Sequence, residues 1–363
     1  MIPVYQPTLK GNEKKYVDDC IDSTWISSKG EYVTKFEKEF ANYIGCHYAA
    51  FVSNGTVAVH LALLALGIGP GDEVIVPTFT YIASVNAIRY VGATPVFVDS
   101  VMDTWQISPE DVERKINSRT RAIIAVHLYG HPCEMDRLVQ IAKDKDIFLV
   151  EDVAEAIGSE YHGKKAGSFG DIACFSFFGN KTITTGEGGM VLTNDSTLYD
   201  RAKRLRNQGN APDREYWNDI IGYNFRSTNI CAAIGLAQLE QIDTFITRKI
   251  AIGEIYKEEL KNLPLRTHEG VGDVLHTKWM CSIVVNEAEE RDELRQYLKE
   301  CDIETRPTFY PAHTMPMYSE KYQRFPVAEY IGWRGINLPS WPGLTDEQVI
   351  FICKKIKDYY IRK

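Results

Sequence analysis

Residues 47–195 alternate short apolar runs with longer segments, and this alternation constrains the fold more than any other feature of the chain. The short runs predict strands, at 48–52, 73–77, 94–98, 121–127 and 148–151. The longer segments predict helices, at 57–66, 81–90, within 107–116 and at 135–145. Repeated strand–helix–strand units imply a mostly parallel sheet with helices on both faces. Ligands of such sheets bind beyond the carboxyl ends of the strands.

The pattern changes after residue 195. Further helices are predicted at 199–208, at 229–245 as one long helix, at 250–260, at 287–300 and at 345–363. Shorter strands and helices from about residue 265 indicate a smaller α+β unit. We therefore predict a large domain at 1–245, with an N-terminal arm at 1–30, and a small C-terminal domain at 246–363.

Composition excludes several classes of protein. The 363 residues are 44% hydrophobic, which is enough for a large buried core. The net charge of −8 comes without a basic stripe, which argues against a nucleic-acid partner. No apolar run approaches the roughly 18 residues that span a membrane, and the N-terminus does not resemble a signal peptide, so we expect a cytoplasmic protein. The eight cysteines form no C-x-x-C pair, which predicts reduced thiols and no metal site.

The run from Ser176 to Gly189 carries the chemistry. It holds one lysine, Lys181, with a hydroxyl five residues before it and the turn Thr-Gly-Glu-Gly-Gly at 185–189 after it. A lysine among small and hydroxylated residues can form a Schiff base with an aldehyde. The hydroxyls and the glycine turn suit a phosphate. Together they indicate pyridoxal 5′-phosphate (PLP), although a single lysine in a glycine-rich loop is more often solvated.

Two other segments strengthen this interpretation. Ser53-Asn54-Gly55-Thr56 joins a strand to a helix, where free amides and the Thr56 hydroxyl suit a phosphate, or where the residues simply cap the helix. Asp152 ends a strand, where a carboxylate can pair with a protonated ring nitrogen or cap a helix. Glu151 and Glu155 are neighbouring candidates. The order phosphate loop, aspartate, serine and lysine is the order that a PLP site of this topology needs.

These segments resemble the DegT/DnrJ/EryC1/StrS family of sugar aminotransferases over essentially the full length of the chain. The resemblance rests on residues 53–56, Gly71 to Pro77, Glu151 to Ala156, Ser176 to Gly189 and Gly222 to Arg226. It implies an α/β fold of the fold-type I PLP-dependent aminotransferases.

The resemblance also implies roles for single residues around the cofactor. Lys181 would bind PLP covalently and move the proton during transamination. Asp152 would pair with the pyridine nitrogen, and Tyr81 would stack on the ring unless it is a core aromatic. Gly55, Thr56 and Ser176 would hold the phosphate. Glu155 falls where many relatives carry glutamine beside the cofactor.

Further implied roles concern the partner and the substrates. Asn224 would reach the phosphate from a second subunit, so the resemblance implies a homodimer with shared active sites. Arg226 is a candidate for a carboxylate or a phosphate, and His313 for the sugar or its diphosphate; a structural role is about as plausible for each. Lys181 is retained where some relatives have histidine and act as dehydratases, which favours transamination.

The pair Phe178-Gly179 replaces the His-Pro of many relatives and is typical of the branch that acts on GDP-linked sugars. That branch implies L-glutamate as amino donor and GDP-4-dehydro-6-deoxy-D-mannose as acceptor, with a product used for O-antigen or related polysaccharides. Two alternatives remain open: an aminotransferase for a UDP- or dTDP-linked 4-keto sugar, and a non-catalytic PLP-binding regulatory protein.

Overall fold

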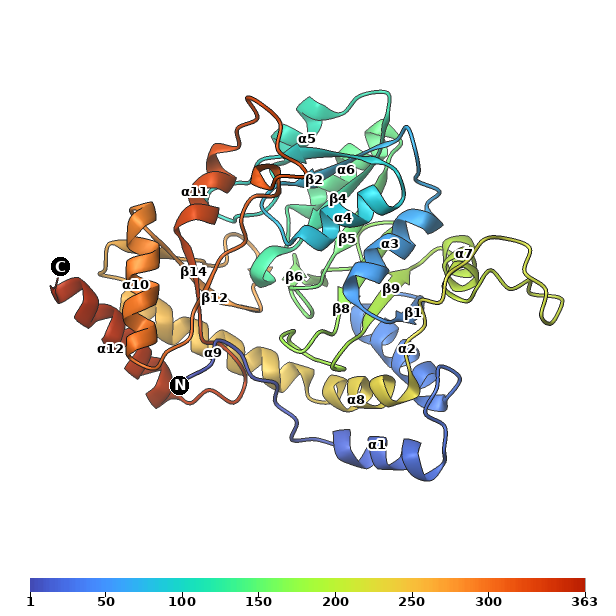
Figure 1. Cartoon of the computed structure of the whole chain (residues 1–363), viewed down its shortest axis with the longest axis horizontal. Coiled ribbons are helices and arrows are strands. Elements are labelled where there is room, and N and C mark those ends of the chain that lie inside the picture. Colours follow the sequence, from blue (N-terminus) through green and yellow to red (C-terminus); the bar gives the residue numbers. More distant parts are fainter. Residues whose placement is uncertain (363) are drawn as a thin grey trace.

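A seven-stranded sheet forms the centre of the molecule in the computed structural model, which describes residues 1–362 (Figure 1). Only β9 runs antiparallel to its neighbours, β1 and β8, so the sheet is mostly parallel, as predicted. The strands lie in the order β1 (Tyr48–Val52), β9 (Gly189–Thr193), β8 (Ile172–Ser176), β5 (Phe148–Asp152), β4 (Thr120–Val126), β2 (Glu73–Pro77) and β3 (Thr94–Val98).

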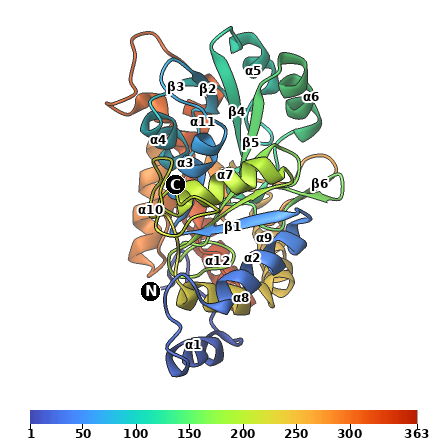
Figure 2. The same ribbon diagram turned by 90° about the vertical axis from the view of Figure 1, so that its right-hand side faces the viewer.

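Alternate residues of these strands enter different apolar clusters. In β2, Val74 and Val76 pack with α3 (Gly55–Ala65) and α4 (Ile82–Tyr90), whereas Ile75 packs with α5 (Pro109–Lys115) and α6 (Met135–Lys145). Successive side chains of a strand point to opposite faces, so the sheet is covered on both sides. Figure 2 shows α5 and α6 on the side of β4 and β5 away from α3 and α4.

The C-terminal part forms a second apolar core around an antiparallel sheet. Its strands lie in the order β10 (Leu265–Thr267), β12 (Cys281–Val285), β14 (Gly335–Leu338) and β13 (Arg306–Pro307). The helices are α9 (Ile242–Leu260), α10 (Ala288–Glu300), α11 (Pro326–Arg334) and α12 (Asp346–Arg362). The chain begins beside this unit, where Ile2 pairs with Ile303 (Figure 1).

The predicted single helix at 229–245 is wrong. The chain forms α8 (Asn229–Leu239) and then α9, with a break at Glu240 and Gln241. Both break residues are held by the N-terminal segment: Glu240 accepts hydrogen bonds from Tyr16 and Asn12, and Gln241 donates to Glu13. These contacts with distant residues outweigh the local helical pattern. The helix predicted at 250–260 is the second half of α9, which runs continuously from Ile242 to Leu260.

The predicted domain boundary at 245–246 lies inside α9. Phe245 and Ile246 pack in a cluster of the large sheet, whereas Ile252, Tyr256 and Leu260 pack in the C-terminal core. One helix therefore contributes to both cores. Among residues 1–362, no helix is both long and apolar enough to cross a membrane.

Candidate active site

Lys181 lies in the loop between β8 and β9, and its side chain is only 12% exposed. The Nζ atom is 3.8 Å from Oε1 of Glu155 and 4.0 Å from the ring centroid of Trp279. Burial lowers the pKa of the Lys181 ammonium, while the charges of Glu155 and Asp152 oppose that shift. A lysine with a lowered pKa is more often neutral, and only the neutral amine attacks an aldehyde.

Asp152 occupies the carboxyl end of β5 and is buried. Its Oδ2 accepts a hydrogen bond of 2.7 Å from the hydroxyl of Ser84 in α4, and its Oδ1 accepts one of 3.1 Å from the amide of Ala154. The preceding residue, Glu151, belongs to the opposite face of the strand. It binds His127 Nε2 at 3.0 Å and the amides of a loop, Gly167, Phe169 and Gly170. Glu151 is therefore structural, and Asp152 remains the candidate for the ring nitrogen.

Glu155 lies on the same side of the site as Lys181. Its Oε2 accepts a hydrogen bond of 3.0 Å from the amide of Tyr129, whose φ of 56° is unusual for a bulky residue. Burial raises the pKa of Glu155 to about 7, against the lowering effect of Lys181. Glu155 therefore changes its charge close to neutral pH.

The N-terminus of α3 lies against Ser176. Asn54 caps the helix by accepting from the amide of Val57 at 2.9 Å, and the amides of Gly55 and Thr56 belong to the first turn, which lacks helical acceptors. A Cβ atom on Gly55 would lie 2.6 Å from Cβ of Ser176, so only glycine permits this approach. First-turn amides, the Ser176 hydroxyl and the positive end of a helix dipole lie together there, which fits a phosphate group.

Tyr81 directly precedes α4, the helix that supplies Ser84 to Asp152. Its side chain is 57% exposed, and its ring centroid lies 5.5 Å from that of Phe309. The ring is thus exposed at the start of the helix whose Ser84 binds Asp152. Residues 55, 56, 81, 84, 152, 155, 176 and 181 supply a set of groups that fits PLP at the carboxyl edge of the sheet: a ring-nitrogen partner, an exposed aromatic ring, a phosphate cradle and a buried lysine.

Three predicted residues lie outside this set. Asn224 accepts from Nε of Arg226 at 3.1 Å, and Arg226 pairs through its backbone with Val52, at the end of β1. His313 is buried, with Nδ1 at 2.7 Å from Thr78 Oγ1 and Nε2 at 3.3 Å from Glu329. Their roles toward a partner subunit or a substrate stay predictions.

The sequence interpretation missed residues that come from distant parts of the chain. The hydroxyl of Tyr5 donates to the carbonyl oxygen of Lys181, and the indole Nε1 of Trp279 donates to the carbonyl oxygen of Asn180 at 2.8 Å. No local motif marks either residue. Ser84 could have been found, because it lies in the first turn of the helix that Tyr81 precedes.

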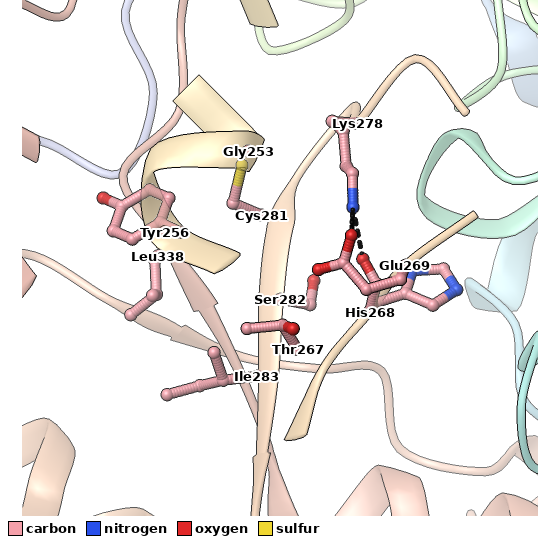
Figure 3. Close-up of a pocket in the computed structure, with 10 residues that line it drawn as sticks. All are labelled: Gly253, Tyr256, Thr267, His268, Glu269, Lys278, Cys281, Ser282, Ile283 and Leu338. Carbon is pink, nitrogen blue, oxygen red and sulfur yellow. Dashed lines mark hydrogen bonds and ion pairs between the residues drawn. The ribbon is translucent and has the colours of Figure 1, made fainter. Parts of the chain in front are cut away.

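The lysine next to Trp279 is not a second candidate. Lys278 lines a narrow pocket between α9, β10 and β12, where its Nζ donates to the carbonyl of His268 at 2.6 Å and to Glu269 at 2.9 Å (Figure 3). The residues that line this pocket include none of the predicted site residues. Lys278 therefore has a structural role. Within residues 1–362, no cluster of side chains suits a metal ion.

The chain is similar to known proteins over nearly its full length. A model of the DegT/DnrJ/EryC1/StrS aminotransferase family matches residues 7–357. The chain is 64% identical to the GDP-perosamine synthase of Escherichia coli O157:H7, over 100% of this chain and 99% of that protein. It is 53% identical to the GDP-perosamine synthase of Vibrio cholerae, over 99% of each chain. Among solved structures, Spr1654 of Streptococcus pneumoniae in its PLP form has a TM-score of 0.94 at 29% identity, covering 99% of both chains.

Proposed function

We propose, from the premise that this chain belongs to the DegT/DnrJ/EryC1/StrS aminotransferase family, that it transfers the amino group of L-glutamate to C4 of GDP-4-dehydro-6-deoxy-D-mannose. The products are GDP-perosamine and 2-oxoglutarate, and the amino sugar serves O-antigen synthesis. The full-length identity of 64% to a GDP-perosamine synthase carries the choice of substrate. The buried Lys181 beside Asp152 and Glu155 carries the choice of reaction.

PLP, when bound, supplies an electron sink that carries the amino group from the donor to the acceptor. Asp152 would hold the ring nitrogen, with its carboxylate oriented by Ser84 and Ala154. Gly55, Thr56 and Ser176 would hold the phosphate at the start of α3. The amine that reacts with the cofactor would come from a third place, the loop between β8 and β9.

Lys181 is that amine. Its burial favours the neutral form, which can bind a carbonyl carbon and accept a proton. Glu155 lies 3.8 Å away and titrates near pH 7, so it can compensate the charge of Lys181 when the amine is protonated. The proton transferred during the reaction would therefore be carried by Lys181 Nζ, and the neighbouring carboxyl group of Glu155 would balance its charge.

The proposed enzyme acts as a homodimer. Residues 207–226 carry Tyr216, Trp217 and Ile221, and the side chains of Tyr216 and Ile221 are 99% and 88% exposed. Large apolar side chains grouped on a surface mark contact sites. Asn224 follows them closely and accepts only from Arg226 among the hydrogen bonds of residues 1–362. A second subunit that covers these residues would receive Asn224 at its own phosphate site.

A substrate panel tests the proposed function. The purified protein, loaded with PLP, is incubated with L-glutamate and GDP-, UDP- or dTDP-linked 4-keto-6-deoxy sugars, and the amino sugar is identified by mass spectrometry and NMR. We expect turnover of the GDP sugar with amination at C4. A preference for a UDP or dTDP sugar would contradict the substrate, and no turnover of any sugar would contradict the reaction. The Lys181→Ala variant, folded but inactive, serves as control.

A further inference from the structure

Trp279 makes two contacts at Lys181 that neither the sequence motifs nor the comparisons assign. The residue directly precedes Met280 and β12 in the C-terminal unit, and its side chain is 3% exposed. Its ring centroid lies 4.0 Å from Lys181 Nζ, within the range of a cation–π interaction. Its Nε1 donates a hydrogen bond of 2.8 Å to the carbonyl oxygen of Asn180. That carbonyl belongs to the peptide group that joins Asn180 to Lys181.

Two further aromatic side chains pack against the indole ring. It stacks on Tyr129 with a centroid distance of 5.8 Å and an interplanar angle of 23°, and on Phe309 at 6.3 Å and 28°. Tyr129 is fully buried, its hydroxyl accepts from the amide of Phe309 at 2.9 Å, and its own amide holds Glu155. The aromatic stack thus forms a rigid support for two groups at once, the indole and the carboxyl partner of Lys181.

The loop around Lys181 depends on such external support. Within the loop, the amide of Lys181 donates to the carbonyl of Phe178 at 2.9 Å, but the buried Oδ1 of Asn180 has no hydrogen-bond partner among residues 1–362. The carbonyls of Asn180 and Lys181 are bound from outside, by Trp279 and by Tyr5. A catalytic amine must be held within about 0.5 Å of its productive position. These two contacts tie the carbonyl groups of Asn180 and Lys181 to remote parts of the chain.

We propose that Trp279 is a positioning residue for Lys181. Its indole N–H fixes the peptide group before the lysine, and its ring face holds the amino group whenever that group carries a proton. The inference rests on the proposed function, since it gives Lys181 its role as the reacting amine. It assigns to the C-terminal unit a direct part in the site that the large sheet builds.

Fluorinated tryptophans test the ring contact without changing the shape of the side chain. Trifluorotryptophan is incorporated at position 279 only, and the cofactor-free protein is labelled with acetic anhydride across a pH series, with the Lys181 peptide quantified by mass spectrometry. An electron-poor ring stabilises the ammonium form less, so we expect the pKa of Lys181 to fall by about half a unit to one unit. The exposed Lys164 serves as an internal control, and the extent of its labelling should be the same in both proteins.

The Trp279→Phe variant tests the N–H contact. It keeps an aromatic ring but loses the hydrogen bond to Asn180, so we expect kcat to fall about twofold to tenfold while KM for the sugar stays unchanged. The matched control is Trp341→Phe, a buried tryptophan in the core of the C-terminal unit, which should keep native kcat.

An unchanged Lys181 titration in the fluorinated protein would overturn the ring contact, and native kcat in Trp279→Phe would overturn the N–H contact. If Trp279→Phe fails to fold, an isosteric benzothienylalanine at position 279 removes the N–H alone and gives the same test. The titration uses no substrate, so its failure is distinct from a failure of the proposed function in the substrate panel.

Discussion

At the scale of single residues, the site depends on two buried ionisable groups of opposite charge, Lys181 and Glu155. Lys181 Nζ and Glu155 Oε1 lie 3.8 Å apart. Burial lowers the pKa of Lys181 and raises that of Glu155, and both shifts favour the neutral form of the side chain. Each charged form is favoured by the other. The pair can therefore keep one proton within the site over the pH range in which the enzyme works, and a change to either group should alter the protonation of its neighbour.

The Glu155→Gln variant should show this through stability. The pKa of Glu155 is raised from 4.5 to about 7 in the folded protein, so its contribution to stability is complete below pH 4.5 and is lost as the pH rises through 7. Glutamine does not titrate. We expect the free energy of unfolding of the variant, relative to the native protein, to increase by up to about 3 kcal/mol between pH 4.5 and pH 8. Urea unfolding of both cofactor-free proteins at several pH values measures this, and parallel curves would contradict the raised pKa.

At the scale of secondary-structure elements, the first turn of α3 does two things. Asn54 caps the helix, and the same turn presents the amides of Gly55 and Thr56 to the predicted phosphate position. Stability and cofactor binding are therefore linked at this helix end. Another capped helix, α5, offers a comparison. Its cap, Ser108, accepts a hydrogen bond of 3.2 Å from the amide of Asp111. This helix packs in a different apolar cluster from α3 and is remote from Lys181 in the sequence.

We expect Asn54→Ala and Ser108→Ala to destabilise the protein by similar amounts, about 1 kcal/mol each. Only Asn54→Ala should also weaken PLP binding, because the frayed turn no longer directs its amides at one point. Urea unfolding gives the first quantity, and a fluorescence titration of the cofactor-free protein with PLP gives the second. Equal PLP affinity in the two variants would show that the start of α3 is not the phosphate site.

Elements and site residues differ in how far the sequence predicts them. Five strands of the large sheet, β1 to β5, and the residues at their ends are predictable, because short apolar runs, glycines and single polar residues are local signals, whereas β8 and β9 are not predicted. Asp152 and Lys181 are of this kind. Trp279 and Tyr5 are not, because each reaches the Lys181 loop from a remote segment and looks like an ordinary core aromatic in sequence. The break between α8 and α9 is hidden for the same reason, since contacts from the N-terminal segment cause it.

At the scale of the whole molecule, a histidine cluster joins the large sheet to the C-terminal unit. His131 follows β4, whereas His268 and His276 belong to the C-terminal unit. The ring centroid of His276 lies 4.7 Å from that of His268 and 5.4 Å from that of His131. All of these rings are buried, and Lys278 adds a positive charge beside them. The cluster is therefore stable only while its histidines are neutral.

Acid should weaken this junction. Burial lowers the pKa of His131 to about 4 and those of His268 and His276 well below 6.5, so the unfolded chain binds more protons and stability is lost as the pH falls below about 6.5. His131 alone should cost about 3 kcal/mol between pH 6.5 and pH 4. The Nε2 atom of His276 has no hydrogen-bond partner among residues 1–362, and its Nδ1 accepts from the amide of Lys278 at 3.3 Å, so His276→Leu removes a titrating group together with that one hydrogen bond.

We expect the unfolding free energy of His276→Leu to fall less steeply with acid than that of the native protein, by about one proton, or about 1.4 kcal/mol per pH unit. The control His162→Gln changes a histidine whose side chain is 50% exposed, and it should follow the native curve. Urea unfolding between pH 4 and pH 7 provides the comparison. If the His276→Leu curve coincides with the native one, the histidine cluster does not cause the loss of stability in acid, and other groups must take up the protons that unfold the protein.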